Sequence, residues 1–226
     1  MFNRLRQAFQ RQDWLAYLIE LLLIVLGITI AYQLNVYAQE NATQEFKRRL
    51  LENLRAENQQ NQQELEDEAK HFDVLPDRLK QLQHWITQKK SPLDSVSEEL
   101  YLVYSWTYYT LNNGYLAHYA NSNVRTNNNA LENELLRLQY TYQNLAQIAD
   151  LAKTYRIEEI NAYLVDRIDY SSGELTASEM QTLQTPPFIN RLVLLTSMEQ
   201  EHRRLYQEAM QQVNEVDSLL SVELGQ

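Results

Sequence analysis

Cysteine is absent from this chain of 226 residues, and glycine and proline occur only four times each. Without cysteine, the chain has no disulfide framework, no thiolate metal site and no cysteine nucleophile. So few glycines and prolines disfavour a β-sandwich or β-barrel, because such folds depend on many tight turns. These absences point to a helical protein, and they leave the redox compartment open.

Basic charge is also scarce, because 20 lysines and arginines stand against 30 acidic residues, for a formal net charge of −10. Binding to nucleic-acid phosphates needs a concentrated basic surface, so we expect no nucleic-acid partner. The chain has no glycine-rich phosphate loop, no nucleophile elbow and no metalloprotease motif. We therefore expect a protein that is not an enzyme and that carries no cofactor.

One long apolar stretch organises the chain, residues 14–37, WLAYLIELLLIVLGITIAYQLNVY. As a helix it is about 36 Å long at 1.5 Å of rise per residue, enough to cross a hydrocarbon core of about 30 Å. Trp14 and Tyr17 lie near one end and Tyr32 and Tyr37 near the other, where aromatic rings prefer the membrane interfaces. The stretch predicts a transmembrane helix with the lipid bilayer as its partner.

The flanks of this stretch bear on processing and orientation. Three arginines precede it within residues 1–13, and Val36-Tyr37-Ala38 resembles a signal cleavage site. The apolar run is longer than a typical signal core, however, so we expect it to be retained as an anchor, with residues 1–13 as a short basic interfacial segment. The positive-inside rule favours a cytoplasmic N-terminus in a bacterial inner membrane, with the soluble domain in the periplasm.

Glu20 is the one carboxylate inside the stretch, about 9 Å from Trp14 along the helix. Three interpretations remain open: a contact with another membrane helix, a side chain that reaches the headgroups, and a proton relay. Gly27 and Ala31 follow Glu20 at spacings of seven and four, and such small residues let two helices approach closely. Gln33 adds a group that can form hydrogen bonds across a contact. We expect Glu20, Gly27, Ala31 and Gln33 to make this contact, in a homo-oligomer or with a partner membrane protein.

Residues 38–90 continue the helical pattern as a long membrane-proximal helix. Pro76 should end or kink it near Val74. The polar run at residues 57–64 either is solvated, the interpretation that we favour, or forms a polar layer at Asn58 and Asn61 that fixes helix register. The apolar residues between Phe46 and Ile86 recur at helical spacing as an interhelical seam, made of Leu50, Leu54, Leu65, Phe72, Leu79, Leu82 and Ile86.

Residues 91–226 predict an antiparallel helical bundle packed with residues 65–88. Residues 101–119 are rich in tyrosine, and we interpret this stripe as core packing rather than as a binding surface for a partner or glycan. Residues 129–132 resemble a capping box, and Thr185 followed by two prolines marks the start of the last helix. A helix kink is expected beyond Tyr155.

Two Glu-x-x-His pairs occur, Glu68 with His71 and Glu199 with His202. In a four-helix bundle, two such pairs and a carboxylate from each remaining helix can bind a di-metal centre. The pairs also arise readily by chance in a glutamate-rich helical chain. We interpret these histidines as surface or core-margin residues and predict no metal site.

The pattern formed by Glu20, Val25, Gly27-Ile28, Ile30-Ala31, Gln33 and Asn35 resembles the hallmark of an uncharacterised family of bacterial single-pass membrane proteins. Family members carry a helical domain of similar length after the anchor. The resemblance extends over the whole chain, including residues 109–143 and 219–224, and departs at Tyr37, where the family has a tryptophan-containing charged stretch. It implies this architecture and emphasises Glu20, but it implies no reaction.

The sequence therefore predicts an all-α protein, with one transmembrane helix that continues into a long helix and then an antiparallel bundle. The favoured function is a membrane-anchored scaffold or assembly subunit that works through oligomerisation or a partner complex. The interhelical seam is expected to make the contact above the membrane. A membrane-anchored sensor that binds a small molecule or peptide is the alternative, and a pocket among Tyr104, Trp106, Tyr108 and Tyr115 would favour it. A di-metal enzyme is the remote alternative.

Overall fold

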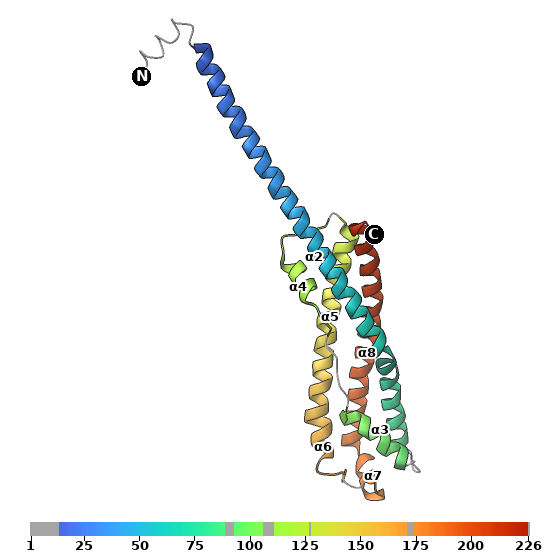
Figure 1. The fold of residues 1–226 in the computed structure, drawn as a ribbon. Coiled ribbons are helices and arrows are strands. Elements are labelled where there is room, and N and C mark those ends of the chain that lie inside the picture. The colour runs from blue at the N-terminus through green and yellow to red at the C-terminus, as the bar shows by residue number, and fades with distance from the viewer. Residues whose placement is uncertain (1–13, 89–92, 106–110, 127, 171–173, 226) are drawn as a thin grey trace. The chain divides into compact units, whose positions relative to one another are not determined.

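The computed structural model describes residues 14–88, 93–105, 111–126, 128–170 and 174–225, and for residues 70–72, 102, 104 and 105 the backbone alone. Every regular element in these ranges is a helix, which confirms the all-α prediction (Figure 1). In chain order the elements are α2 (Trp14–Thr87), α3 (Leu93–Ser105), α4 (Gly114–Asn121), α5 (Asn129–Tyr155), the π-helix η1 (Arg156–Asn161), α6 (Ala162–Leu164), α7 (Ala177–Leu183) and α8 (Pro186–Leu224).

The chain divides into two compact units, residues 1–49 and residues 50–226, and α2 contributes to both. The transmembrane candidate lies in the first unit, and the second unit is the bundle. The sequence analysis expected the bundle to pack with residues 65–88. The bundle in fact includes α2 from Leu50 onward, because Leu50, Leu51 and Leu54 are buried in its core.

α2 continues through Pro76 to Thr87, so of the two expected effects of this proline, an end of the helix is wrong, and a kink stays a prediction. Proline removes one backbone donor from the helix ladder. Leu75 and Leu79, on either side of Pro76, are each at most 2% exposed. Burial of these neighbours in the bundle core offsets the missing hydrogen bond.

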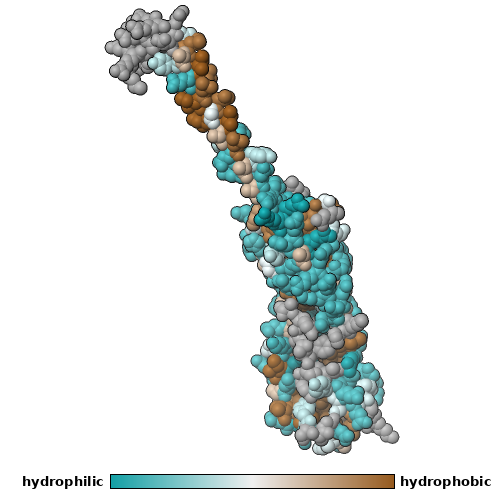
Figure 2. Space-filling view, viewed as in Figure 1, coloured by the Kyte–Doolittle hydropathy of each residue, from teal (hydrophilic) through white to brown (hydrophobic). Residues whose placement is uncertain are grey.

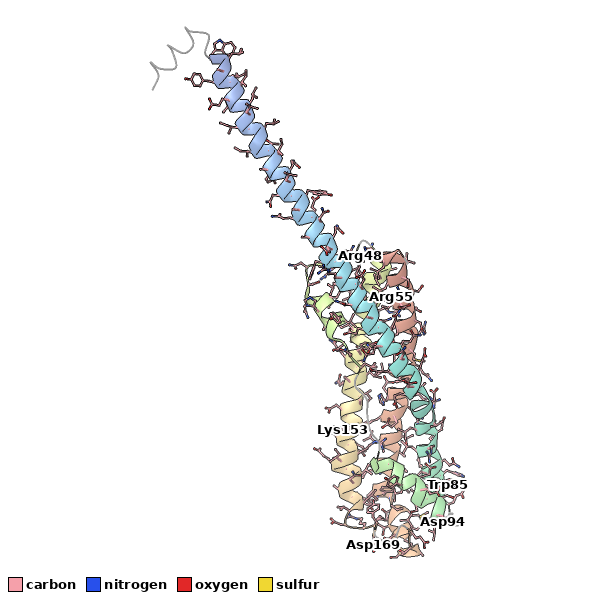
Figure 3. All side chains as sticks on the ribbon, in the orientation of Figure 1. Arg48, Arg55, Trp85, Asp94, Lys153 and Asp169 are labelled. Carbon is pink, nitrogen blue, oxygen red and sulfur yellow. The ribbon has the colours of Figure 1, made fainter. Side chains whose placement is uncertain are left out.

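α8 runs antiparallel to the bundle part of α2. Arg55, labelled in Figure 3, lies 3.2 Å from Asp217 through its Nε, whereas Arg203 lies 3.0 Å from Asp77. Residue numbers thus fall along α8 as they rise along α2. α5 packs along α8 as the third long helix.

The bundle contains two apolar cores. The first draws on α2, α4, α5 and α8, and the second on α2, α3, η1, α6, α7 and α8 with the connections between them. The first core includes Leu50, Leu54, Leu65, Leu116, Leu135, Leu138, Tyr142, Leu205, Val213 and Val216. The second includes Leu79, Leu82, Ile86, Val96, Leu100, Ile160, Leu164, Leu183, Phe188 and Leu192.

The helix termini show how local sequence sets the boundaries. Asn128 caps α5, because its side chain accepts hydrogen bonds from Ala130 N and Leu131 N. The expected capping box at residues 129–132 is therefore wrong by one position, and Glu132 instead accepts a hydrogen bond from Thr126 N. α8 begins at Pro186 after Thr185, as predicted.

η1 is a π-helix that joins α5 to α6, at the place where the sequence analysis expected a kink; the kink itself stays a prediction. Upstream, the buried positions alternate spacings of four and three, through Leu135, Leu138, Tyr142 and Leu145. From Ala152 they follow at spacings of four only, at 156, 160 and 164. A wider turn is what keeps such a spacing on one face, so η1 directs Arg156, Ile160 and Leu164 into the interior.

Candidate functional site

The first unit exposes an apolar surface along α2. An 18-residue window of this helix has a mean hydropathy of 2.3, and none of it is buried within the chain, so α2 is long and apolar enough to cross a membrane. Figure 2 shows this part of the helix as mostly brown, with lighter and teal patches between the brown ones. An apolar surface of this kind is covered in a cell by lipid or by another protein.

Glu20 is exposed on this helix and has no hydrogen bond or ion pair with the described residues. At 100° per residue, Gly27 and Ala31 lie within about 20° of Glu20 around the helix axis. A Cβ atom added at Gly27 would meet nothing within 4 Å, so no contact within the chain explains this glycine. Gln33 lies about 140° from Glu20 by the same periodicity, and so it faces a different direction from the other three.

The interhelical seam is buried at every position whose side chain is described. Leu50, Leu54 and Leu65 belong to the first core, and Leu79, Leu82 and Ile86 to the second. Phe72 lies outside the described side chains. The seam packs against α5, α8 and the shorter helices of the same chain, so the expectation that it makes an assembly contact above the membrane is wrong for these positions.

Three side chains of the polar run at residues 57–64 form a buried layer, so the interpretation of a solvated turn is wrong for them, while Gln59, Gln60 and Gln63 are exposed. Glu57, Asn58 and Asn61 are each at most 5% exposed. The Glu57 carboxylate accepts hydrogen bonds from Tyr115 N at 2.8 Å and from Leu116 N at 3.0 Å. These amides belong to the first turn of α4, which has no side-chain cap of its own. Glu57 therefore supplies from α2 the negative charge and the acceptors that a helix N-terminus favours.

The two asparagines of this layer join further elements to α2. Asn61 donates from Nδ2 to Asn112 O at 2.6 Å and to the Tyr142 hydroxyl at 3.1 Å, and its Oδ1 accepts from Asn112 N at 3.1 Å. Asn58 donates from Nδ2 to Val213 O on α8 at 2.8 Å. Burial raises the pKa of Tyr142 above its ordinary value, so this hydroxyl stays neutral. The layer fixes the register of α2 against α4, α5 and α8.

A second buried polar layer lies between the two apolar cores. Arg156, the first residue of η1, donates from Nη2 to Glu199 Oε1 on α8 at 2.7 Å, and from Nη1 to Val103 O near the end of α3. His202 Nδ1 lies 3.4 Å from Glu199 Oε2. These three side chains are at most 3% exposed. The layer thereby ties η1, α3 and α8 together through charged groups.

The two Glu-x-x-His pairs differ in how deeply their side chains are buried. Glu199 and His202 are interior residues, so the interpretation of this histidine as a surface or margin residue is wrong. Glu68 is partly buried, and the side chain of His71 lies outside the described ones. Within the described part of the chain, no group of three or more histidine or carboxylate side chains could hold a metal ion.

The tyrosines of residues 101–119 differ in their exposure to solvent. Tyr101 is 57% exposed and Tyr115 is 43% exposed, so core packing is the wrong interpretation for these two, while Tyr119 is buried. The side chains of Tyr104, Trp106 and Tyr108, where a sensor pocket was considered, lie outside the described residues. Tyr119 bonds through its hydroxyl to Glu132, and burial raises its pKa.

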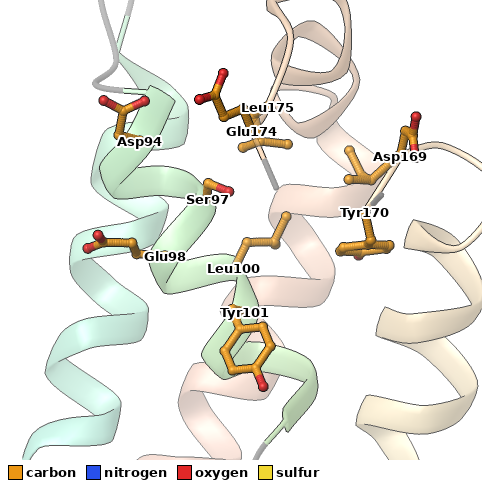
Figure 4. A pocket seen from close by; sticks show the side chains of 10 residues that line it. Asp94, Ser97, Glu98, Leu100, Tyr101, Asp169, Tyr170, Glu174 and Leu175 are labelled. Atoms are coloured by element: carbon orange, nitrogen blue, oxygen red, sulfur yellow. The ribbon is translucent and has the colours of Figure 1, made fainter. Parts of the chain in front are cut away.

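A pocket of about 560 Å³ lies between α3 and the connection that precedes α7. Leu100, Ile168 and Leu175 contribute apolar surface to it. Four carboxylates also line it, from Asp94, Glu98, Asp169 and Glu174, and those of Glu98 and Asp169 point away from the leucines (Figure 4). Its lining thus combines apolar surface with negative charge, which is suited to a small organic cation. None of these residues was singled out by the sequence as a ligand site.

Comparison with protein-family models, with curated proteins and with solved structures finds no match. Function must therefore be argued from the residues and their geometry.

The residues that the sequence analysis missed are those of the buried charged layers. Arg156 and Glu199 lie 43 positions apart, and a salt bridge at that separation has no local signature. One signal was present for Arg156, because it falls four residues after Ala152 on the buried face of α5. Glu57 likewise stood in line with the apolar seam, whereas Asn58 and Asn61 had already been considered as a polar layer.

Proposed function

We propose that this protein is a membrane-anchored scaffold or assembly subunit, which acts through contacts of the helix at residues 14–37 with a second copy or with another membrane protein. The observation that carries the proposal is the fully exposed apolar surface of this helix, in a chain whose bundle already buries its own core. This surface of the helix needs a covering, from lipid or from another protein.

Glu20 supports an in-membrane contact. A carboxylate inside a hydrocarbon core is costly unless it is paired, protonated or directed at other protein. Gly27 and Ala31 lie on the same side of the helix and offer the close approach at which an interhelical hydrogen bond forms. Gln33 serves a second contact on another side of the same helix.

The first experiment is the mass of the full-length protein in detergent, measured by light scattering, beside Glu20→Ala. We expect a defined oligomer or heteromer for the parent and a smaller species for the variant. Leu21→Ala is the matched control, because Leu21 lies about 100° from Glu20 and about 120° from Gln33 around the helix. A parent and Glu20→Ala variant of equal mass, with no partner retained by either, would contradict the proposal.

For the compartment, we propose a bacterial inner membrane with the bundle in the periplasm, on the basis of the arginines that precede the span. The absence of cysteine makes a direct test possible. Ser218→Cys introduces one thiol at an exposed position of α8. A membrane-impermeant maleimide should label it in intact spheroplasts, and labelling only after the membrane is permeabilised would reverse the orientation.

The pocket at α3 favours a second candidate, a sensor that binds a small organic cation. Benzylamine and benzyl alcohol are a suitable pair of probes, because they share a ring and differ in charge at pH 7. We expect benzylamine to raise the unfolding temperature of the full-length protein and benzyl alcohol to leave it unchanged, with the effect reduced in Glu98→Gln. An equal response to both probes would contradict this candidate.

A further inference from the structure

We propose that the bundle binds one water molecule in its interior, where the water accepts a hydrogen bond from the Tyr142 hydroxyl on α5 and donates one to Asn58 Oδ1 on α2. The site belongs to the buried layer around Glu57, Asn58 and Asn61. The inference goes beyond the proposed assembly function and does not depend on it, because every residue involved lies in the second compact unit, residues 50–226.

A small cavity lies inside the bundle at this layer. Its volume is about 10 Å³, close to the roughly 10–15 Å³ that one water molecule requires. Every residue that lines it is at most 5% exposed, so the cavity is an interior one. An apolar cavity stays dry, whereas one that offers two to four polar partners can hold a water. The polar residues of this lining are Glu57, Asn58, Asn61 and Tyr142, and the others are aliphatic.

Asn58 contributes an acceptor that no described residue satisfies. Its Oδ1 is buried and accepts no hydrogen bond from the described part of the chain, and the residue is 4% exposed. The orientation of the amide is defined, because Nδ2 donates to Val213 O at 2.8 Å and a flipped amide would place two oxygens against each other. A buried acceptor without a donor bears the full cost of its desolvation, so this oxygen requires a donor from within the cavity.

The Tyr142 hydroxyl has the complementary requirement. Its oxygen accepts from Asn61 Nδ2 at 3.1 Å, whereas its own hydrogen is donated to no described residue. Buried tyrosine hydroxyls usually have a hydrogen-bond partner, and Tyr142 is 5% exposed. Asn58 and Asn61 lie three residues apart and so share one face of α2. An acceptor without a donor and a donor without an acceptor therefore line the same cavity.

The chemistry of these two groups selects water as the occupant. A water molecule accepts the Tyr142 hydrogen and donates one of its own hydrogens to Asn58 Oδ1. Its second hydrogen has the Glu57 carboxylate as an acceptor, because Glu57 also lines the cavity. A monovalent cation would be coordinated by the same oxygens, but it could not accept the Tyr142 hydrogen. The volume of about 10 Å³ excludes an organic ligand.

The bound water would make the polar layer one continuous hydrogen-bond network. The network runs from Val213 O on α8 through Asn58 to the water, and from Tyr142 on α5 through Asn61 to the backbone of Asn112. A buried polar network rigidifies a core when every member is satisfied. The water thus completes the contacts that hold α2 against α5 and α8.

Magnetic relaxation dispersion of the water ¹⁷O nucleus tests the site in the full-length protein in detergent. The method detects water molecules that stay bound for longer than the protein takes to tumble, and it does not respond to exchanging hydroxyl protons. Val216→Ile adds one carbon to the wall of the cavity and should displace the water, which lowers the number of long-lived waters by one. Val96→Ile is the matched control, because Val96 is a buried valine of the second core that does not line the cavity.

Asn58→Leu is a second variant, which keeps the proposal testable if Val216→Ile does not fold. It removes the acceptor and places apolar atoms in the cavity, so we expect the same loss of one long-lived water. Gln63→Leu, at an exposed glutamine of α2, should lose none. An unchanged number of long-lived waters in folded Val216→Ile or Asn58→Leu would overturn the inference, as would an equal loss in Val96→Ile.

A change of salt separates water from a bound monovalent cation. The thermal unfolding midpoint of the parent is measured in sodium chloride and in choline chloride at equal ionic strength, beside Asn58→Leu. We expect the two salts to give the same midpoint for each protein, because water occupies the cavity in both. A midpoint that sodium raises in the parent and not in Asn58→Leu would assign the cavity to a cation and overturn the inference.

Discussion

At the scale of single residues, Glu57 shows how one buried carboxylate can organise a neighbouring helix. Its two oxygens accept from the amides of Tyr115 and Leu116, and Leu116 is itself a core residue. A buried amide that loses its acceptor must bear the full cost of its desolvation. The position of α4 against the first core therefore depends on a side chain that lies 58 and 59 residues away in the sequence.

We expect Glu57→Ala to lower the free energy of unfolding by about 1–3 kcal/mol, because it leaves the first turn of α4 without acceptors. Denaturant unfolding followed by circular dichroism measures this change. Glu66→Ala is the control, since Glu66 is exposed and accepts only from Gln62, four residues before it. Equal stabilities for the two variants would show that α4 does not depend on Glu57.

The buried pair of Arg156 and Glu199 makes a second prediction at this scale. Glu199→Ala should destabilise the bundle by about 3–5 kcal/mol, because the Arg156 charge then remains in an apolar interior without its carboxylate. The double variant Arg156→Met with Glu199→Leu should recover most of this loss, because it removes both charges together.

Unfolding midpoints of Arg156→Met, of Glu199→Leu and of the double variant form the required cycle. Arg204→Ala, which breaks an exposed pair with Glu201, should change stability by less than about 1 kcal/mol. A double variant that is less stable than both single variants would contradict this prediction. It would show that the attraction between Arg156 and Glu199 stabilises the fold by more than the burial of the two charges costs.

At the scale of elements, η1 allows the residues that follow α5 to keep their buried side chains directed into the second core. The spacings of four, four and four after Ala152 require a turn wider than that of an α-helix. Removal of one residue between Arg156 and Ile160 would change these spacings to four, three and four, which an α-helix accommodates on one face.

We therefore expect deletion of Glu158, an exposed residue of η1, to convert the π-helix into α-helix with a change in unfolding free energy of about 1 kcal/mol or less. Deletion of Gln143 in α5 is the control, because it rotates every downstream residue by about 100° and so exposes Leu145 and Ala152. Circular dichroism and thermal unfolding compare the two proteins. If deletion of Glu158 is as damaging as deletion of Gln143, the π-helix is not a one-residue insertion.

At the scale of the whole bundle, buried tyrosines predict its behaviour at alkaline pH. Burial raises the pKa values of Tyr119, Tyr142 and Tyr206 above the ordinary value of 10.0. The folded state therefore holds these hydroxyls neutral, whereas the unfolded chain ionises them near pH 10. The stability they contribute is present below pH 10 and is lost as the pH rises further.

We expect helicity to fall cooperatively above about pH 10, together with the rise in tyrosinate absorbance. Tyr140→Phe should not change this transition, because Tyr140 is exposed in both states. Tyr142→Phe should reduce the pH dependence, since it removes one of the three ionisable groups. Tyrosinate absorbance that rises fully near pH 10 with helicity intact would contradict the prediction.

Much of this architecture follows from the sequence alone. The apolar stretch at residues 14–37 has a length and composition that only a bilayer-spanning or tightly covered helix satisfies. The interhelical seam and the boundaries of α8 follow from periodicity and from Thr185-Pro186, since each depends on residues within a turn or two of one another.

Only the tertiary structure determined which polar residues are buried and which are exposed to solvent. A run such as residues 57–64 is solvated or buried according to which partners reach it from distant segments, and here Asn112, Tyr115, Tyr142 and Val213 do so. The same holds for Arg156 and Glu199, and for the pocket beside α3. Hydrophobic periodicity is a local property of the chain, whereas the satisfaction of a buried charge or amide depends on contacts across many tens of residues.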